Sequence, residues 1–262
     1  MNGKDRVRAK KFLGQHFLKD DAVARDIVDA LQLPKGLSTV LEIGPGMGVL
    51  TCHLLQKKGV SLYAIELDRE SVAYLITHFP ELVGRLIEGD FLQLDLTALL
   101  PEPFAIIGNF PYNISTQILF RVMEHRDHIP VVVGMFQKEV AERIASPPGN
   151  RDYGILSVLL QPWYDIHYLF TVLEHQFDPP PRVKSAVISL RRNQRTSLQC
   201  SERFFVKLVK QAFSQRRKTL RNALKPLLQG EQEGIPYLDL RAEALSWQQF
   251  EQLGVLLEQR NG

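Results

Sequence analysis

Short apolar runs alternate with segments of helical periodicity over the first 145 residues. Runs rich in Val, Ile and Leu predict strands at 40–43, 61–65, 86–88, 105–108 and 131–136. Apolar residues spaced three and four apart predict helices at 21–33, 48–57, 69–78, 115–125 and 138–145. Continuous apolar strands that alternate with helices are typical of a parallel sheet covered on both faces, so we expect an α/β fold.

The pattern changes after the break at 147–150, Pro-Pro-Gly-Asn. A helix is predicted at 153–160 and two further strands at 166–173 and 185–190, which gives seven strands in all. The proline-rich segment 177–183 between these two strands is expected to be a stiff, extended loop. Polar residues at 193–201 predict a linker, and helical segments follow it. We therefore expect a large α/β domain at 1–192 and a small helical domain at 193–262.

The composition is that of a globular protein with a substantial core. The chain has 262 residues, of which 45% are hydrophobic. No apolar run approaches the roughly 18 residues that a membrane span needs, and the basic start lacks the apolar stretch of a signal peptide, so no membrane association and a cytoplasmic location are expected. Cys52 and Cys200 are far apart and lack CxxC partners, which argues against a disulfide framework and against a metal site.

Positive charge is concentrated in two segments, although the net charge is only +3. Residues 1–19 contain six lysines and arginines against one aspartate, and residues 191–225 contain eleven against one glutamate, so the rest of the chain is acidic. Two basic segments beside an acidic body favour a polyanionic partner. A solvated helix face is the alternative for each segment.

Ligand-binding residues are predicted at the ends of four successive strands. Gly44 and Gly46 belong to a GxGxG turn that follows a strand and opens a helix, where glycines let a ligand approach the backbone. Glu66 ends the next strand and is suited to accept hydrogen bonds from ribose hydroxyls. Asp90 and Phe91 follow the third strand and offer a carboxylate and a ring to an adenine. Each has a structural alternative, such as a turn or a helix cap. Together they favour S-adenosylmethionine, with no metal.

Asn109-Phe110-Pro111-Tyr112 follows the fourth strand and therefore falls on the same edge of the sheet. The amide oxygen of Asn109 and the carbonyl before Pro111 are both acceptors, and two acceptors aimed at one exocyclic amine turn its lone pair toward an electrophile. Tyr112 offers a flat surface to an extruded base. Taken alone, the tetrapeptide is also ordinary turn chemistry. Beside the predicted cofactor residues, it indicates an adenine amino group as the methyl acceptor.

The chain closely resembles the ribosomal RNA adenine dimethyltransferases, specifically the bacterial type that modifies two adjacent adenosines near the 3′ end of small-subunit ribosomal RNA. The resemblance covers nearly the whole chain. It is carried by FLGQHFL from Phe12, EIGPGMGVLT from Glu42, IELD from Ile65, GD at Gly89, GNFPYNIST from Gly108, QKEVAERI from Gln137, YGILSV from Tyr153, FDPPPRVKSAV from Phe177 and AFSQRRKTLRNAL from Ala212.

The resemblance implies a Rossmann-like class I fold, with a mostly parallel seven-stranded sheet and a small C-terminal all-helical domain. It implies that the methyl-donor site is lined by His16, Leu18, Gly44, Glu66, Asp90 and Asn109. His16 stands where many relatives have Asn, and imidazole also donates and accepts. Phe177 matches an aromatic that covers the second face of the target base; a hydrophobic plug under a loop is the alternative.

The expected partner is small-subunit ribosomal RNA in the immature subunit, bound by a monomer. Arg216, Arg217, Lys218 and Arg221 are the candidates for phosphate contacts, with pairing to acidic residues of the main domain as the alternative. Three other functions stay open. The erythromycin-resistance type performs the same chemistry on large-subunit RNA, although the triple-proline loop and QRRKTLRN favour the small-subunit type. A DNA adenine methyltransferase is disfavoured because no separate sequence-reading domain is evident. An assembly factor with secondary catalysis is the alternative from a different class.

Overall fold

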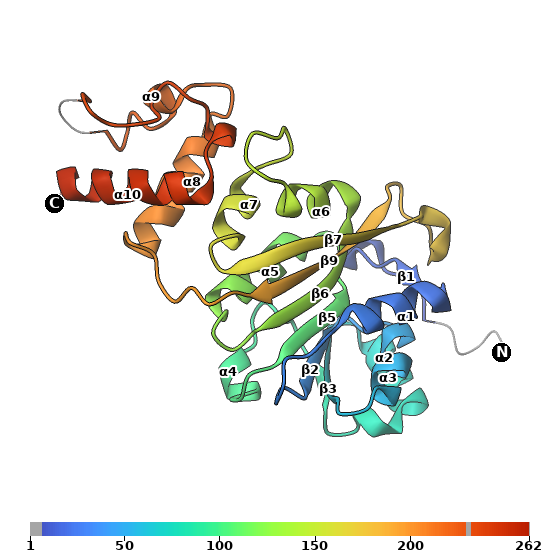
Figure 1. Ribbon diagram of the computed structural model, residues 1–262. Helices are drawn as coiled ribbons and strands as arrows, with labels where there is room; N and C mark the ends of the chain where they lie inside the picture. The colour runs from blue at the N-terminus through green and yellow to red at the C-terminus, as the bar shows by residue number, and fades with distance from the viewer. Residues whose placement is uncertain (1–6, 229–231, 262) are drawn as a thin grey trace. The chain divides into compact units, whose positions relative to one another are not determined.

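A seven-stranded sheet forms the centre of the first compact unit in the computed structural model, which describes residues 7–228 and 232–261 (Figure 1). The strands are β2 (Thr39–Ile43), β3 (Ser61–Glu66), β4 (Leu86–Glu88), β5 (Ala105–Asn109), β6 (Val131–Gln137), β7 (Tyr164–Val172) and β9 (Ser185–Arg192). Their order across the sheet is β4-β3-β2-β5-β6-β9-β7. Strands β2 to β6 are parallel and β9 is antiparallel to β6, so the expected mostly parallel sheet is confirmed.

Helices cover both faces of this sheet (Figure 1). One face carries α1 (Asp21–Ala30), α2 (Val49–Gln56) and α3 (Arg69–His78), and the other carries α4 (Leu96–Leu99) and α5 (Ser115–Glu124). Alternate strand residues such as Val40, Leu62 and Ile107 join the buried side chains of α1 to α3 in one core. Helix α6 (Lys138–Ala145) follows β6 directly. Because β2 to β5 run in parallel, their carboxyl ends meet at one edge of the sheet.

A second, two-stranded sheet ties the start of the described chain to the proline-rich segment. Strand β1 (Phe17–Leu18) pairs antiparallel with β8 (Phe177–Asp178), with Leu18 opposite Phe177. The Lys19 amide extends the ladder by donating to the carbonyl of Gln176 at 2.9 Å. The first part of segment 177–183 is therefore a short strand, not only the extended loop that its prolines predict.

The second compact unit consists of residues 142–166 together with 193–262. It contains α7 (Ile155–Leu160), α8 (Glu202–Ser214), α9 (Leu220–Ala223) and α10 (Trp247–Asn261). Helix α8 begins at the Ser201 cap and buries Phe205, Leu208, Val209 and Ala212. The predicted boundary after residue 192 coincides with one division of the chain, whereas segment 142–166 groups with the C-terminal helices because α7 packs against α8. In the part of the chain that is described, every helix is too short or too polar to cross a bilayer.

Candidate functional site

A cavity of about 870 Å³, including its open mouth, lies at the carboxyl ends of β2 to β5. Most of the predicted ligand residues line it: His16, Gly44, Gly46, Glu66, Asp90, Phe91, Asn109, Pro111 and Tyr112. The structure thus brings together side chains from four strand ends and from the segment before β1.

The glycine turn after β2 forms the floor of the cavity and requires glycine for two separate reasons. Gly44 and Gly46 have φ angles of +66° and +58°, in the left-handed region that other residues rarely adopt. At Gly46 a Cβ would also lie 2.8 Å from Cε1 of Phe17, which is closer than a carbon contact allows. The Phe17 ring therefore lies directly on the turn, where a larger residue would displace it.

Glu66 holds this turn to the end of β3. Its Oε2 accepts a hydrogen bond from the Gly46 amide at 3.0 Å, and its Oε1 accepts one from the Asp68 amide at 2.9 Å. The side chain is buried, and burial raises the pKa of the carboxyl, which the two amide hydrogen bonds partly offset. Each carboxylate oxygen can accept a second hydrogen bond, so Glu66 retains the capacity to bind hydroxyl groups.

Asp90 and Phe91 line the cavity after β4, in line with the prediction. Asp90 also shapes its own turn: Oδ1 accepts from the Leu92 amide at 2.9 Å and Oδ2 accepts from Nε2 of Gln93 at 3.0 Å. Phe91 is only 3% exposed, so it presents a small part of its ring to the cavity. Asp90 therefore stabilises a turn, not the start of a helix as in the helix-cap alternative, and it also lies in the cavity wall.

The Asn109 amide has a fixed orientation. Its Nδ2 donates to the backbone carbonyl of His16 at 2.8 Å, which leaves the Oδ1 atom as a hydrogen-bond acceptor. The imidazole of His16 stacks on the Tyr112 ring, with centroids 5.4 Å apart and planes at 29°. Nδ1 of His16 donates to the carbonyl of Pro179 at 2.8 Å, and this bond fixes the ring. Burial raises the pKa of Tyr112, whose hydroxyl shares a 2.5 Å hydrogen bond with Ser185.

Phe110 packs beneath the neighbouring Asn109 and Pro111. Its ring is 1% exposed and meets the edge of Phe136 at a centroid distance of 5.1 Å and an angle of 81°. It lies over the backbone of Gly134 on β6, where a Cβ would come within 2.3 Å of the ring. The ring therefore fills the space that a side chain at position 134 would need.

Two predicted site residues lie elsewhere. Leu18 is 3% exposed and lines a smaller neighbouring cavity, together with Gly44 and Asn109, instead of the main one. Phe177, opposite Leu18 in the two-stranded sheet, is 1% exposed and belongs to the hydrophobic core. The ring of Phe177 is therefore packed in the core, as in the hydrophobic-plug alternative, and its role at the target base stays a prediction.

Glu42 is a buried polar residue that the sequence reasoning did not select. It is 1% exposed at the end of β2 and accepts a 2.7 Å hydrogen bond from the Thr51 hydroxyl. Burial raises the pKa of its carboxyl to about 8, and the nearby charge of Glu66 adds to the effect. An acidic residue inside an otherwise apolar strand, directly before the glycine turn, is the sequence signal that could have identified it.

The segment before β1 also contributes to the cavity wall. Leu13, Gly14 and Gln15 line the cavity beside His16. The Lys10 ammonium anchors this segment through ion pairs with Asp68 at 2.5 Å and Glu70 at 3.1 Å. Of the basic residues predicted at 1–19, Lys4 and Arg6 lie outside the described residues, while Arg8, Lys11 and Lys19 are exposed.

The basic stretch after α8 divides into two kinds of residue. Arg216 donates to the carbonyls of Arg151 and Tyr153, and the Arg221 guanidinium pairs with Asp239 at 2.9 Å. Arg217 and Lys218 are exposed. Arg221 is therefore paired, but its acidic partner lies within the same compact unit and not in the main domain, as the pairing alternative had it.

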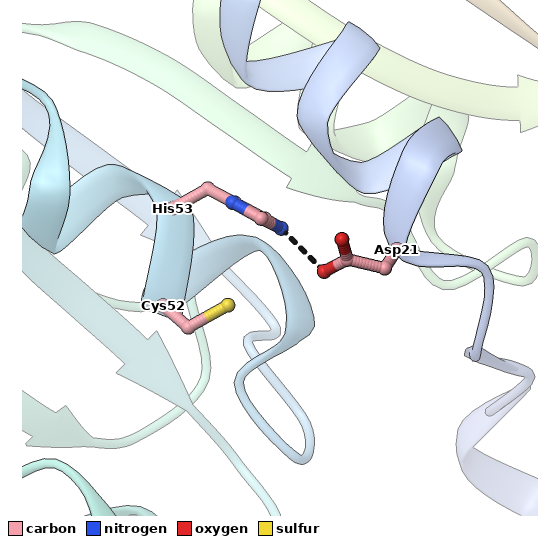
Figure 2. Close-up of side chains that lie close together, drawn as sticks. All are labelled: Asp21, Cys52 and His53. Atoms are coloured by element: carbon pink, nitrogen blue, oxygen red, sulfur yellow. Dashed lines mark hydrogen bonds and ion pairs between the residues drawn. The ribbon is translucent and has the colours of Figure 1, made fainter.

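Figure 2 shows the one group of side chains in the described residues whose spacing resembles a metal site: Asp21, Cys52 and His53. Nε2 of His53 lies 2.8 Å from Oδ1 of Asp21, and this hydrogen bond is the main cause of the lowered pKa of Asp21. The Cys52 thiol donates to the carbonyl of Val49, and burial raises its pKa. The hydrogen bond between His53 and Asp21 links α2 to α1 and accounts for the proximity of the three side chains.

The sheet order, the glycine turn after β2 and the acidic residue that ends β3 define a class I, S-adenosylmethionine-dependent methyltransferase. Residues 6–246 match the model of the family described as ribosomal RNA adenine dimethylase. The chain belongs to this family.

Similar proteins agree with this assignment. The chain is 58% identical over 247 residues to "Ribosomal RNA small subunit methyltransferase A" of Cytophaga hutchinsonii. The match covers 94% of this chain and 96% of the relative. Among solved structures, a dimethyladenosine transferase from Plasmodium falciparum matches with a TM-score of 0.76 and 25% identity, over 94% of this chain and 98% of its own. The 23S rRNA methyltransferase ErmE matches with a TM-score of 0.66 and 25% identity. This match covers 91% of the present chain and 99% of the ErmE chain.

Proposed function

We propose that this chain transfers methyl groups from S-adenosylmethionine to N6 of two adjacent adenosines near the 3′ end of small-subunit ribosomal RNA. The observation that carries the proposal is the fixed amide of Asn109, a residue that lines the same cavity as the glycine turn and Glu66. The name of the 58% identical relative supports the small subunit as the target.

The residues fit a donor that carries a ribose and an adenine. Glu66 would bind the ribose hydroxyls, Asp90 the adenine amino group and Phe91 a face of the adenine ring, while the glycine turn admits the methionine portion close to the backbone. When bound, S-adenosylmethionine supplies a methyl group already activated by the positive sulfur. The protein therefore needs to contribute position and alignment, without a metal or a covalent nucleophile.

The acceptor side of the cavity would hold the flipped adenine. Oδ1 of Asn109 and the carbonyl before Pro111 would accept hydrogen bonds from the N6 amine, and Tyr112 would stack on the base. The N6–methyl bond forms as the carbon–sulfur bond breaks, its electrons stay on sulfur, and the amine proton leaves to water. A second cycle on the same nitrogen gives dimethyladenosine, so the pocket must also admit a monomethylated amine.

Two alternatives differ in target or in role. ErmE, a structural neighbour, is named for large-subunit RNA, but at 25% identity it is more distant than the small-subunit relative at 58%. An assembly factor with secondary catalysis would bind immature subunits regardless of transfer. In our proposal the protein acts in the cytoplasm as a monomer on the immature subunit, with phosphate contacts from the basic stretch after α8.

Replacing Asn109 by Ala tests the proposed role of the amide. We expect the variant to bind S-adenosylmethionine within a few-fold of the wild type and to lose methyl transfer by about 100-fold or more, because the lone-pair alignment is lost. The measurement is transfer of labelled methyl groups to small subunits that lack the modification, followed by mapping of the label, with calorimetry for donor binding. Asn222→Ala is the matched control, since Asn222 bonds to Thr219 in the other compact unit.

Four outcomes decide the proposal. Label on two adjacent adenosines near the 3′ end of small-subunit RNA supports it, whereas transfer only to large-subunit RNA, in a parallel assay on large subunits, would support the erythromycin-resistance type. Unchanged transfer by Asn109→Ala would exclude the amide clamp. If the Asn109 variant still binds immature subunits, binding and catalysis are separate duties of the protein.

A further inference from the structure

The most exposed large apolar side chain among the described residues is Phe12. Its relative exposure is 78%, and it lies in the short 3-10 helix η1 (Lys11–Leu13). An exposed aromatic ring is a favourable contact surface because its burial removes a large apolar area from water. The residues around Phe12 indicate which kind of ligand would bury its ring.

Phe12 lies at the rim of the cavity. The next two residues, Leu13 and Gly14, line the cavity wall, as does Asn113. Nδ2 of Asn113 donates to the Phe12 carbonyl at 3.4 Å, and a Cβ at Gly14 would meet Oδ1 of Asn113 at 2.6 Å. The backbone of this helix is therefore held against the loop that follows Tyr112, while the ring of Phe12 stays in solvent.

Exposed cations directly precede the ring in the chain. Arg8 and Lys11 are both exposed, and Lys10 is held by Asp68 and Glu70, which fixes the segment to the start of α3. An exposed aromatic ring beside exposed cations is the kind of surface that binds unpaired nucleotides, because the cations attract phosphate and the ring stacks on a base.

We propose that Phe12 is a stacking platform for the base of a nucleotide next to the target adenosine. The inference rests on the proposed function, because it requires an RNA strand from which the target base is flipped. A flipped base leaves its neighbour without a stacking partner, and the ring of Phe12 at the rim takes that place. Phe12 thereby contributes to RNA binding and not to the binding of the methyl donor.

Replacing Phe12 by Ala should raise the KM for unmodified small subunits about 10-fold, the typical loss of one base–aromatic stack. The kcat and the KM for S-adenosylmethionine should stay within about 2-fold. Phe12→Trp keeps a stacking surface and should restore the wild-type KM. Val83→Ala removes another exposed apolar side chain, 67% exposed after η2 (Pro80–Leu82), and should have no effect.

Photo-crosslinking identifies the partner directly. Phe12→p-benzoylphenylalanine, irradiated on unmodified small subunits, should crosslink to RNA within one or two nucleotides of the target adenosine. A crosslink only to ribosomal protein, or none to RNA, overturns the proposal, as does an unchanged KM for Phe12→Ala. A parallel rise in the KM for S-adenosylmethionine would show a structural role of the segment and also overturns it. Absence of transfer by the wild type would overturn the proposed function itself, which distinguishes the two failures.

Discussion

Glu42 and Glu66 lie in similar surroundings, but their carboxyl groups have different hydrogen-bond partners. Both are buried near the glycine turn, and burial raises the pKa of each. Glu66 accepts from two backbone amides, which stabilise its charged form, whereas Glu42 accepts from a single hydroxyl. With a pKa of about 8, Glu42 is largely neutral at pH 7. Because Glu42 is neutral, Glu66 is not repelled by a second buried negative charge.

The raised pKa of Glu42 predicts a specific dependence of stability on pH. Its carboxyl titrates near 4.5 when unfolded and near 8 when folded, so the folded state binds more protons between these values. The unfolding free energy therefore falls by about 1.4 kcal/mol per pH unit from this group as the pH rises through that window. Glu42→Gln, which can still accept from Thr51, should lack this component and should become more stable than the wild type toward pH 8.

Urea denaturation of both proteins at several pH values between 5 and 8.5 measures this difference. Glu81→Gln is the matched control, because Glu81 is an exposed glutamate and its replacement should leave the pH profile unchanged. Parallel profiles for the wild type and Glu42→Gln would show that Glu42 titrates normally in the folded state.

At the scale of elements, continuous apolar runs predicted the strands β2, β3, β5 and β6 and the helices between them. The rule that parallel strands end at one edge then brought Gly44, Glu66, Asp90 and Asn109 into one cavity. Strands β1 and β8 escaped prediction because two residues are too few to show alternation. Their pairing joins segments about 160 residues apart, as Leu18 opposite Phe177 shows.

This pairing also explains why two predicted site residues lie outside the main cavity. Leu18 and Phe177 are buried by contacts between β1 and β8, and no local pattern reports such a contact. Helix α4 was missed because it has only four residues, although Asp95 caps it by accepting from the amides of Thr97 and Ala98.

The contact between β1 and the glycine turn predicts that Gly46→Ala impairs donor binding. The substitution strains a φ of +58° and forces the Phe17 ring away from the turn, so we expect at least a 10-fold loss of affinity for S-adenosylmethionine. Gly59→Ala is the matched control: its φ is +77°, but nothing lies within 4 Å of its Cβ. It should lower stability by about 1 kcal/mol through strain alone and leave affinity unchanged. Equal loss of affinity in both variants, measured by calorimetry, would contradict the role of the Phe17 contact.

At the scale of the whole molecule, each of the two compact units is built from two separate segments of the chain. Segment 142–166 leaves the first compact unit and joins residues 193–262, because the face of α7 that buries Val158 and Leu159 packs in the second unit with α8. The composition change after residue 192 predicted one boundary. The other could not be predicted, since α7 has the same apolar character as the helices beside the sheet.

The exposed cations of the second compact unit predict how RNA binding depends on salt concentration. Arg217→Gln with Lys218→Gln should weaken RNA binding and reduce the slope of log affinity against log salt by about 1 to 2, because two exposed cations no longer displace counterions. Arg221→Gln should change the slope less, since Arg221 already pairs with Asp239. Binding to unmodified small subunits over a range of salt concentrations measures both. An unchanged slope in the double variant would exclude this stretch from phosphate contact.

The Phe110 ring above Gly134 sets a rule for how the sequence of this protein can diverge. The two positions share one volume, so a bulky residue at 110 requires glycine at 134, as seen here. A Cβ at 134 would lie 2.3 Å from the Phe110 ring and 2.8 Å from the Phe136 ring, so a side chain there requires a smaller residue at 110 and a shift of Phe136, whereas enlarging 134 first creates a clash with both rings. Substitutions at the two positions should therefore be correlated among distant relatives, and mutational paths that begin at 134 should be rare.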